Sequence, residues 1–590
     1  MSTLKEGENS MIEYVCHRCD DLSCETSVCP VCGSRTTLKS TNIYWSEKYN
    51  TPSFDEYDED GKKLKYIAKD IRPVFAEERL LLEVIQGIPM QWVGKSVWNA
   101  GGSNYIVDGK KLALSYSKIA KDNEPSYLIE EIKRYQKDNQ HIVDTFMQQS
   151  YIVNFIKINA SRLNAITNEA IEYIKEKSEH WEEDSIFVSF SGGKDSTVSS
   201  HLTMTALGTE KVIHIYGDTT LEYPTTTEYV KRFRLKHTTT PMLVAKNKDQ
   251  DFNNLCDVIG PPSRVLRWCC TIFKTGAITR KIETTFKNKK RILSVQGIRR
   301  IESLARSKYD RDSEESKIKK QSVISPIIDW MDFDVWLYIL SNQIDFNEAY
   351  KQGFSRVGCW CCPNNSSWSG YLASIYMNEE HTKFNDILYG FAKKAGKVDW
   401  KEYVDEGKWK ARQGGNGLEA SNNAVVTFSP CALEENAFNF TLSRPISTKL
   451  YTLFIPFGKV DFSIGNERLG EVYVIDKSDG MPLLKLTGKI GKYELKVSVL
   501  KTTNVFKNKK VVESLIKDQI TKYQTCIGCS ACQSVCRFDA CKVINLEKGN
   551  VSNETIHYEI DPNKCVGCLE CVKHFTNGCY MKKVLRTKKG

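Results

Sequence analysis

The residues best suited to chemistry form one short run in the middle of this 590-residue chain. An apolar segment, residues 186–190, runs directly into Ser191, Gly192, Gly193, Lys194, Asp195 and Ser196. Adjacent glycines let the backbone approach a polyphosphate, and a helix that begins here would direct its free N–H groups at the anion. Lys194 adds a point charge, and the two serines add hydroxyl donors. The run therefore predicts a phosphate-binding turn between a buried strand and a helix, rather than a glycine turn that only joins them.

Cysteines form the second chemically distinctive group, with 21 in the chain. In a reducing compartment, groups of cysteines at ligand spacing indicate metal binding rather than disulfides. The first group is a pair of CxxC motifs near the N-terminus, made by Cys16, Cys19, Cys29 and Cys32. Two such turns can place four thiolates tetrahedrally around zinc, and the Cys-Pro-x-Cys-Gly form resembles a zinc ribbon. We predict a structural zinc site here, with Cys24 and His17 as spare ligands; the alternative is reduced, metal-free thiols.

The cysteines near the C-terminus follow a different pattern, CxxCxxCxxxC, then CxxCxxC and one further cysteine. This resembles the bacterial two-cluster ferredoxin run, in which the fourth cysteine of each run serves the other cluster. The resemblance assigns one [4Fe–4S] cluster to Cys526, Cys529, Cys532 and Cys579. It assigns the second to Cys565, Cys568, Cys571 and Cys536. Arg537 replaces the usual proline and the last spacing is longer, so Cys541 stays an alternative fourth ligand. Two clusters would conduct electrons, or would be purely structural.

Strand-like and helical runs alternate around the glycine turn. The strand-like runs are residues 186–190, 212–216, 242–245 and 292–296. Alternation of this kind predicts an α/β fold with a parallel sheet, in which ligands bind beyond the carboxyl ends of the strands. Polar motifs follow the strands at residues 218–224, 267–274, 297–306, 325–330 and 334–336.

These motifs, in this order, resemble the phosphoadenosine phosphosulfate reductase family of the PP-loop ATP-pyrophosphatase superfamily, whose members split ATP between the α- and β-phosphates. The resemblance covers residues 181–370. It implies that Asp218 and Glu222 lie near the ribose or adenine, and that Arg299, Arg300 and Arg306 lie near the anion. The six residues 191–196 would bind the nucleotide, and the expected catalytic residues are Lys194, Asp195, Arg299 and Arg306.

A third cysteine set lies inside the same region and consists of Cys269, Cys270, Cys359 and Cys362. A tandem pair with a distant CxxC resembles the ligand set of the [4Fe–4S] adenylyl sulfate reductases in that family. Four thiolates suit zinc as well as an iron–sulfur cube, so zinc remains the alternative. Cys361 could also replace Cys359 or Cys362 as a ligand.

Two departures from the reductases decide the predicted function. Those enzymes generally carry a degraded form of the loop, whereas this chain keeps all six residues 191–196, and it lacks their Glu-Cys-Gly-type tail with its nucleophilic cysteine. We therefore expect an enzyme that binds ATP and Mg²⁺ and transfers AMP to an acceptor with loss of pyrophosphate. A resemblance to the ATP-pyrophosphatase component of DNA phosphorothioation systems suggests sulfur transfer to nucleic acid. The alternatives are a sulfonucleotide reductase that releases sulfite, and a non-catalytic nucleic-acid-binding or electron-carrying protein.

The net charge and the residue patterns along the chain indicate the rest of the expected organisation. The net charge of +10 suits an anionic partner such as nucleotide or nucleic acid, although a solvated basic face would look the same. No apolar run approaches membrane-spanning length, so we expect a cytoplasmic protein with a nucleotide substrate, an electron donor and a sulfur-donor protein. The expected segments are a zinc ribbon (1–40), a small α+β module (41–120), a helical segment (121–180), the PP-loop domain (181–370), a helical extension (371–423), a β-rich module (424–505), and a helix with a ferredoxin-like domain (506–590).

Overall fold

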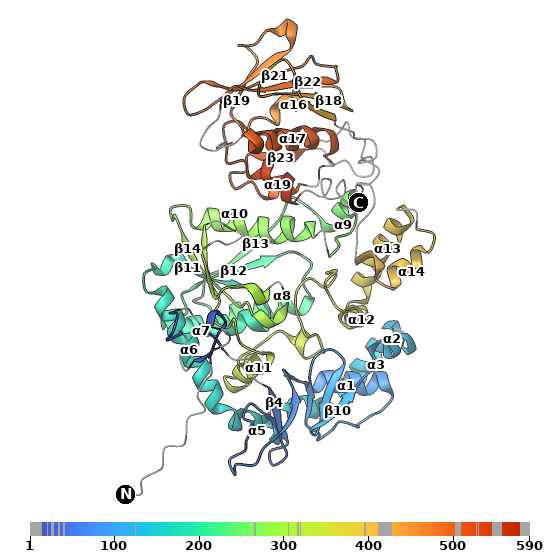
Figure 1. Ribbon diagram of the computed structural model, residues 1–590. Helices are drawn as coiled ribbons and strands as arrows, with labels where there is room; N and C mark the ends of the chain where they lie inside the picture. The colour runs from blue at the N-terminus through green and yellow to red at the C-terminus, as the bar shows by residue number, and fades with distance from the viewer. Residues whose placement is uncertain are drawn as a thin grey trace. The chain divides into compact units, whose positions relative to one another are not determined.

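The protein is described from a computed structural model (Figure 1). The described residues are 14–19, 22–24, 29–33, 36–38, 42–123, 125–264, 267–304, 306–314, 318, 320–394, 397–410, 427–501, 509–526, 528, 530–544 and 557–578. Their contacts form two compact units, Met1–Val244 with Phe286–His381, and Ala245–Thr285 with Thr382–Gly590. Within the described residues, no helix combines the length and the apolar character that a membrane crossing requires.

The first unit is organised around a six-stranded sheet with the order β13-β12-β11-β14-β16-β15. Its strands are β11 (Ile186–Phe190), β12 (Ile213–Asp218), β13 (Met242–Lys246), β14 (Ile292–Gln296), β15 (Asp312–Ser313) and β16 (Gln321–Ile324). β11 pairs in parallel with both β12 and β14, and β14 pairs in parallel with β16, whereas β15 is antiparallel to β16. The strand order reverses beside β11, so the turns that follow β11 and β14 lie at the switch point where parallel sheets bind ligands. The parallel sheet predicted from the sequence is confirmed.

Helices pack on this sheet and carry its connecting loops. They include α7 (Lys194–Leu207), α8 (Pro224–Lys236), α11 (Asp332–Ser341) and α12 (Ser367–Tyr376). α7 contacts β11 and β14 and is buried along most of its length although it is rich in serine and threonine. Its hydroxyls are satisfied locally: Thr203 donates to the Ser199 carbonyl at 2.6 Å, and Ser200 bonds the buried His214 ring at 2.7 Å. A polar helix can be buried here because its side chains find partners.

Small sheets and helices precede the six-stranded sheet in the same unit. The three sheets contain β1 (Tyr14–Cys16), β2 (Leu22–Cys24) and β3 (Thr37–Leu38); β4 (Ile43–Ser46), β5 (Thr51–Ser53) and β6 (Lys65–Ala68); and β7 (Arg72–Pro73), β8 (Val97–Asn99), β9 (Asn104–Val107) and β10 (Lys110–Ala113). The helices are α1 (Ala76–Gln86), α2 (Tyr116–Asp122), α3 (Pro125–Asp138), α4 (Gln140–Asp144), α5 (Ser150–Ile158) and α6 (Ala160–Ser178). Asp108 and Gly109, between β9 and β10, have φ values of 45° and 74°, which suit a tight hairpin turn.

One hydrophobic core joins these N-terminal elements to the helices that pack on the six-stranded sheet. It contains Trp98 from β8, Phe155 from α5, Val198 from α7 and Trp336 from α11, all buried. A buried ion pair fixes α11 against α6, because Arg162 donates to both carboxylate oxygens of Asp334, at 2.7 and 3.0 Å. The N-terminal elements therefore help to hold the helices that border the glycine turn.

The second unit combines a β-module with the cysteine-rich C-terminus. Its antiparallel sheet has the order β17-β18-β22-β21-β20-β19, with β17 (Thr427–Pro430), β18 (Ala437–Thr441), β19 (Lys459–Asp461), β20 (Glu471–Ile475), β21 (Pro482–Thr487) and β22 (Glu494–Val499). The remaining elements are α9 (Phe252–Ile259), the π-helix η4 (Cys270–Thr275), α10 (Gly276–Thr285), α13 (Asn378–Lys394), α14 (Trp400–Asp405), α16 (Thr448–Thr452), α17 (Lys509–Thr525), α18 (Ala531–Ser534), β23 (Cys541–Ile544), β24 (His557–Ile560) and α19 (Glu570–Gly578). A single core joins the sheet to α17 and α19, through side chains such as Leu484, Ile516 and Val572.

Candidate functional site

The glycine turn lies directly after β11, and α7 begins at Lys194. Gly192 has φ = 72°, and a Cβ there would lie 2.9 Å from the Thr226 methyl carbon, so both the conformation and the space require glycine. The two serines of the turn bond to each other, since the Ser191 hydroxyl donates to Ser196 Oγ at 3.1 Å. The turn is thus shaped before any ligand binds. The predicted strand–turn–helix arrangement is confirmed.

Two buried cations from different strand ends meet beside this turn. Lys194, on α7, is 4% exposed, and Arg299, in the loop after β14, is 2% exposed. They share the Asp332 carboxylate: Oδ1 lies 3.3 Å from Lys194 Nζ and 2.6 Å from Arg299 Nη2. Asp195 completes the network, with Oδ2 at 3.3 Å from Lys194 Nζ and Oδ1 at 2.6 Å from Arg299 Nε as an ion pair.

The charges in this network stabilise one another. Burial by itself lowers the pKa of Lys194 and of Arg299, but Asp195 and Asp332 more than offset it and raise both. Burial likewise tends to raise the pKa of Asp332, yet the two cations hold it below its usual range. Lys194, Arg299 and Asp332 are therefore charged at neutral pH.

A fifth charged residue reaches the network from the N-terminal elements. Asp70 precedes β7, and its carboxylate accepts the backbone N–H groups of Asp332 at 2.9 Å and Phe333 at 3.0 Å, at the start of α11. Burial, followed by repulsion from the Asp332 carboxylate, raises the pKa of Asp70 to about 7. The sequence analysis missed both aspartates. Asp332 follows the noted residues 325–330 at a helix start, whereas no motif marks Asp70.

The other predicted arginines after β14 form ion pairs with different carboxylates. Arg300 pairs with Asp329 and donates from Nε to the Tyr309 carbonyl at 3.0 Å. Arg306 pairs with Glu302, four residues before it. Burial and then the neighbouring Arg356 lower the pKa of Arg306. Of the three predicted arginines, Arg299 is the one that contacts Asp195 and Asp332 in the described structure. Contacts of all three arginines with an anion stay predictions.

The predicted acidic residues of the second strand end shape a turn. Asp218 accepts the Thr220 N–H at 2.8 Å, and Thr220 has φ = 65°. Glu222 accepts both the N–H and the hydroxyl of Thr219, the latter at 2.6 Å, while burial raises the Glu222 pKa. The Thr219 hydroxyl also lies 3.4 Å from the Cys359 sulfur. A predicted ligand cysteine therefore lies beside the turn, and contacts of Asp218 and Glu222 with a nucleotide stay predictions.

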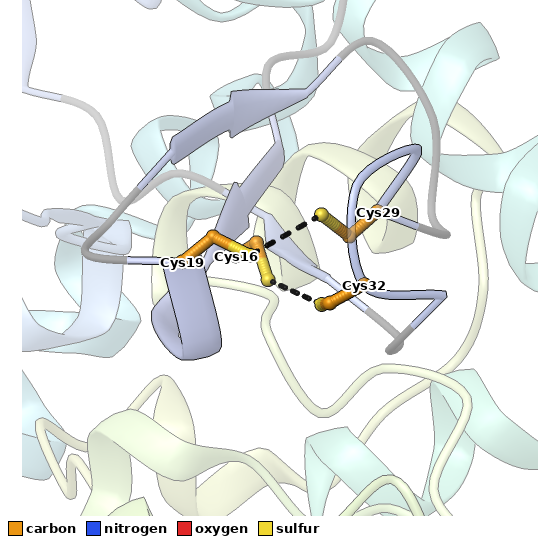
Figure 2. Close-up of side chains that lie close together, drawn as sticks. All are labelled: Cys16, Cys19, Cys29 and Cys32. Atoms are coloured by element: carbon orange, nitrogen blue, oxygen red, sulfur yellow. Dashed lines mark hydrogen bonds between the residues drawn. The ribbon is translucent and has the colours of Figure 1, made fainter.

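The N-terminal cysteines converge as a metal site requires (Figure 2). Cys16 and Cys32 Sγ are 3.5 Å apart, Cys29 and Cys19 Sγ are 3.9 Å apart, and all four sulfurs lie within 4.8 Å of one another. A tetrahedral zinc site with bonds of about 2.3 Å separates its sulfurs by roughly 3.8 Å. The donor set therefore fits one zinc ion. Cys24, the spare thiol, instead lies 3.5 Å from the Leu22 carbonyl.

The C-terminal cysteines lie around a buried lysine in the second unit. Cys529 and Cys579 fall outside the described residues. Lys522, on α17, is 1% exposed. Burial alone lowers its pKa, but four neighbouring sulfurs more than offset this and raise it, those of Cys532, Cys571, Cys541 and Cys526. A cation among thiols fits a site whose sulfurs are deprotonated, as they are when they bind iron. Cys541, the alternative ligand, belongs to this group.

The third cysteine set is divided between the units. Cys269 and Cys270 lie at the start of η4 in the second unit, and Cys359 and Cys362 lie in a loop of the first. Each half is described in its own unit, and the shared cluster stays a prediction.

Within the second unit, η4 and α10 lie against the cysteine-rich segment. η4 packs on α18, which contains Cys532. A Cβ on Gly276 would lie 2.7 Å from the Ser534 carbonyl oxygen, so this approach requires glycine. Arg537 Nη1 also lies 3.5 Å from Glu283 Oε1 on α10. The tandem cysteine pair therefore lies at the start of a helical segment that packs on α18, the helix that contains Cys532.

Comparisons with known proteins agree with the sheet and the turn. The family model "Phosphoadenosine phosphosulfate reductase domain" matches residues 185–365. The uncharacterized Methanocaldococcus jannaschii protein MJ0973 is 31% identical over 299 residues, which are 48% of this chain and 71% of that protein. An adenosine 5′-phosphosulfate reductase of Neisseria meningitidis is 35% identical over 101 residues, so the chain covers 36% of its length.

Among solved structures, the phosphate complex of a Candida auris phosphoadenylyl-sulfate reductase covers 32% of this chain and 94% of that chain. Its sequence identity is 16% and its TM-score is 0.25. The family assignment rests on the matched domain and on the M. jannaschii relative. On these grounds the chain belongs to the phosphoadenosine phosphosulfate reductase family.

Proposed function

We propose that this protein is an iron–sulfur PP-loop enzyme that binds ATP with Mg²⁺ and adenylates an acceptor. The acceptor oxygen attacks the α-phosphorus, the bond between the α-phosphorus and the bridging oxygen breaks, and pyrophosphate leaves with its Mg²⁺. Adenylation makes the acceptor oxygen a leaving group that sulfur can displace. We place the enzyme in cytoplasmic sulfur transfer, with nucleic acid as a candidate acceptor and a protein as the sulfur donor.

The observation that carries this proposal is the carboxylate shared by Lys194 and Arg299. Both cations are buried at the switch point of the sheet and contact Asp332 Oδ1. A triphosphate brings several negative charges, and buried cations stabilise such charge more strongly than exposed ones. Phosphate oxygens that replace part of the contact with Asp332 would leave both cations directed at the departing pyrophosphate. Asp195 would then be available to a Mg²⁺ ion, whose preferred ligands are oxygens.

The metal groups belong to the same proposal. Zinc would be held by the N-terminal quartet. Two [4Fe–4S] clusters would be held by the C-terminal cysteines, and a third by Cys269, Cys270, Cys359 and Cys362, with zinc as the alternative there. Bound clusters would supply single electrons from an external donor. The protein's own contribution is the buried Lys522 and the packing of η4 on α18.

Nucleotide binding gives the test that needs no known acceptor. We expect a nonhydrolysable ATP analogue to bind in a Mg²⁺-dependent way, and Lys194→Ala to weaken binding at least tenfold. Lys289→Ala is the matched control, because Lys289 makes its ion pairs with the exposed Glu182 and Asp184 in the same unit. Equal binding by the wild type and Lys194→Ala, or none by either, would rule out the adenylation proposal and favour a non-catalytic role.

A sulfonucleotide reductase is the second candidate, because relatives with that name match parts of the chain. In that reaction a thiolate attacks the sulfur of adenylyl sulfate and AMP leaves, after which reduction of the thiosulfonate releases sulfite. Anaerobic protein is given adenylyl sulfate and a dithiol, and free sulfite is measured. Sulfite formation without pyrophosphate release from ATP and any acceptor would select this candidate over adenylation.

A further inference from the structure

The loop that carries three cysteines lies against the nucleotide side of the first unit. Cys359, Cys361 and Cys362 fall within four consecutive positions. The loop is tied to residues 218–224 by the backbone, since the Trp360 N–H donates to the Leu221 carbonyl at 2.9 Å. Three thiols are therefore fixed beside a turn at the end of β12.

Tyr223, in that turn, has a buried hydroxyl for which the described residues provide no hydrogen-bond partner. The side chain is 3% exposed, and its ring packs on Phe354 with centroids 4.6 Å apart. An unsatisfied buried hydroxyl is costly, so such a group in a native protein indicates a ligand or a special role. The hydroxyl therefore requires an acceptor that the polypeptide alone does not supply.

The cysteine loop pairs with the residue before Tyr223, since Glu222 and Cys359 form an isolated antiparallel bridge. Burial raises the pKa of Tyr223 above its usual range, and the next contributions come from Cys361, Cys359 and Cys362. A tyrosine with a raised pKa stays protonated and acts as a hydrogen-bond donor. A free thiol is a weak acceptor, whereas a thiolate bound to a metal keeps negative charge and accepts well. The donor set and the orphaned hydroxyl both fit a metal group bound at this loop.

We propose that Tyr223 donates a hydrogen bond to a metal-bound thiolate of the Cys359–Cys362 loop and thereby raises the reduction potential of the iron–sulfur group held there. It is a positioning residue, because it acts through the sulfur ligand and contacts neither substrate nor reacting atoms. The proposal rests on the metal site within the proposed function and is independent of ATP cleavage.

The expected direction follows from electrostatics. Reduction adds an electron to the group and increases the negative charge on its sulfurs. A hydrogen bond to sulfur stabilises that reduced state more than the oxidised state, and hydrogen bonds are among the factors that set these potentials. Removing the donor should therefore make the group harder to reduce.

The experiment is a redox titration of anaerobically purified, full-length protein, followed by electron paramagnetic resonance. The component that belongs to this site is identified first, as the signal that both Cys359→Ser and Cys362→Ser remove. Tyr223→Phe keeps the ring and removes one oxygen atom. The matched control is Tyr376→Phe, because Tyr376 packs on the same ring, Phe354, but its charged neighbours are Glu77 and Glu78.

We expect Tyr223→Phe to shift this component to a more negative midpoint potential, and Tyr376→Phe to leave it unchanged. No shift, a positive shift, or an equal shift in the control would overturn the proposal. So would a wild type without any component that both serine variants remove. Because Mg²⁺-dependent binding of the ATP analogue is measured separately, failure here leaves the adenylation proposal standing, and failure there leaves this one standing.

Discussion

The glycine-turn site of the first unit and the cysteine-rich end of the second both contain buried cations, but the negative partners of these cations differ. In the turn site, Lys194 and Arg299 are buried against the carboxylates of Asp195 and Asp332, so both cations have partners within the polypeptide. In the C-terminal segment, Lys522 is buried among cysteine sulfurs, which carry full negative charge once they bind metal. The first site therefore pairs its cations within the polypeptide, whereas the predicted cluster site would give Lys522 fully negative partners once metal is bound.

The N-terminal quartet extends this contrast. Its sulfurs converge within 4.8 Å, the size of a single-ion site, whereas the described residues of the C-terminal segment contain no such convergence. A cube holds its thiolates farther apart, because each binds a different iron atom. The same CxxC spacing thus serves two kinds of predicted site, and the supporting backbone determines which one forms.

The largest expected effect concerns the N-terminal quartet, because metal binding supplies about 10–16 kcal/mol in small zinc sites. Cys29→Ser should lose the zinc and unfold residues 14–38, while hydrogen exchange at α7 stays unchanged. Elemental analysis and hydrogen exchange measure both. Cys24→Ser is the control and should keep the zinc. Two results would contradict this contrast between the two classes of site. One is a wild-type protein without zinc, and the other is that residues 14–38 stay ordered after chelation.

Asp332→Ala should have the next largest effect, since it leaves two buried cations without their shared partner. Breaking a buried pair in this way costs about 3–5 kcal/mol, and partial exposure of Asp332 places the value near the lower limit. The free energy of local opening of α7, from hydrogen exchange, is the measure. Asp345→Ala breaks a half-exposed pair with Arg232 and should change it by less than about 1 kcal/mol. Equal effects would mean that the network is no more than a surface feature.

Gly276→Ala tests the attachment of α10 to the cysteine-rich segment. The new methyl would lie 2.7 Å from the Ser534 carbonyl oxygen, and overpacking of this kind costs about 1–3 kcal/mol. Faster hydrogen exchange at residues 531–534 is the expected result. Gly390→Ala, on α13 of the same unit, meets nothing within 4 Å and should stabilise its helix by up to about 1 kcal/mol. Unchanged exchange at residues 531–534 would contradict the close packing.

The last expected effect is a pH dependence that Asp70 introduces. Its pKa is about 7 in the folded protein, against about 3.9 in an unfolded chain. Between these values the folded state binds more protons, so stability falls as pH rises from about 4 to 7 and is constant above. Asp332 and Arg299 are the charged groups that face Asp70, and their charges do not change in this window. Local opening of α11, followed against pH, should show the slope.

Asp70→Asn is the corresponding control, because it removes the titrating proton and the repulsion from Asp332. The slope attributed to Asp70 should then disappear. A slope that persists in the variant would assign the pH dependence to other groups and would separate the N-terminal elements from the turn site.

The sequence by itself determined the parallel sheet, the phosphate-type turn and the N-terminal cysteine quartet. These features depend on short-range patterns: a buried strand that runs into two glycines, and thiols on neighbouring turns. Gly192 illustrates the reason, since its left-handed conformation is set within the turn and is therefore visible in local sequence.

Only the tertiary structure decided which charged side chains meet. Asp70 and Asp332 are separated by most of the first unit's chain, yet they face each other at the start of α11. Arg300 and Arg306 belong to the same motif as Arg299, but they pair with Asp329 and Glu302 instead. The turn that contains Tyr223 is likewise joined to a loop far along the chain, since the Trp360 N–H donates to the Leu221 carbonyl. Long-range packing sets the partners of a buried charge or hydroxyl, and these partners cannot be predicted from the local spacing of residues in the sequence.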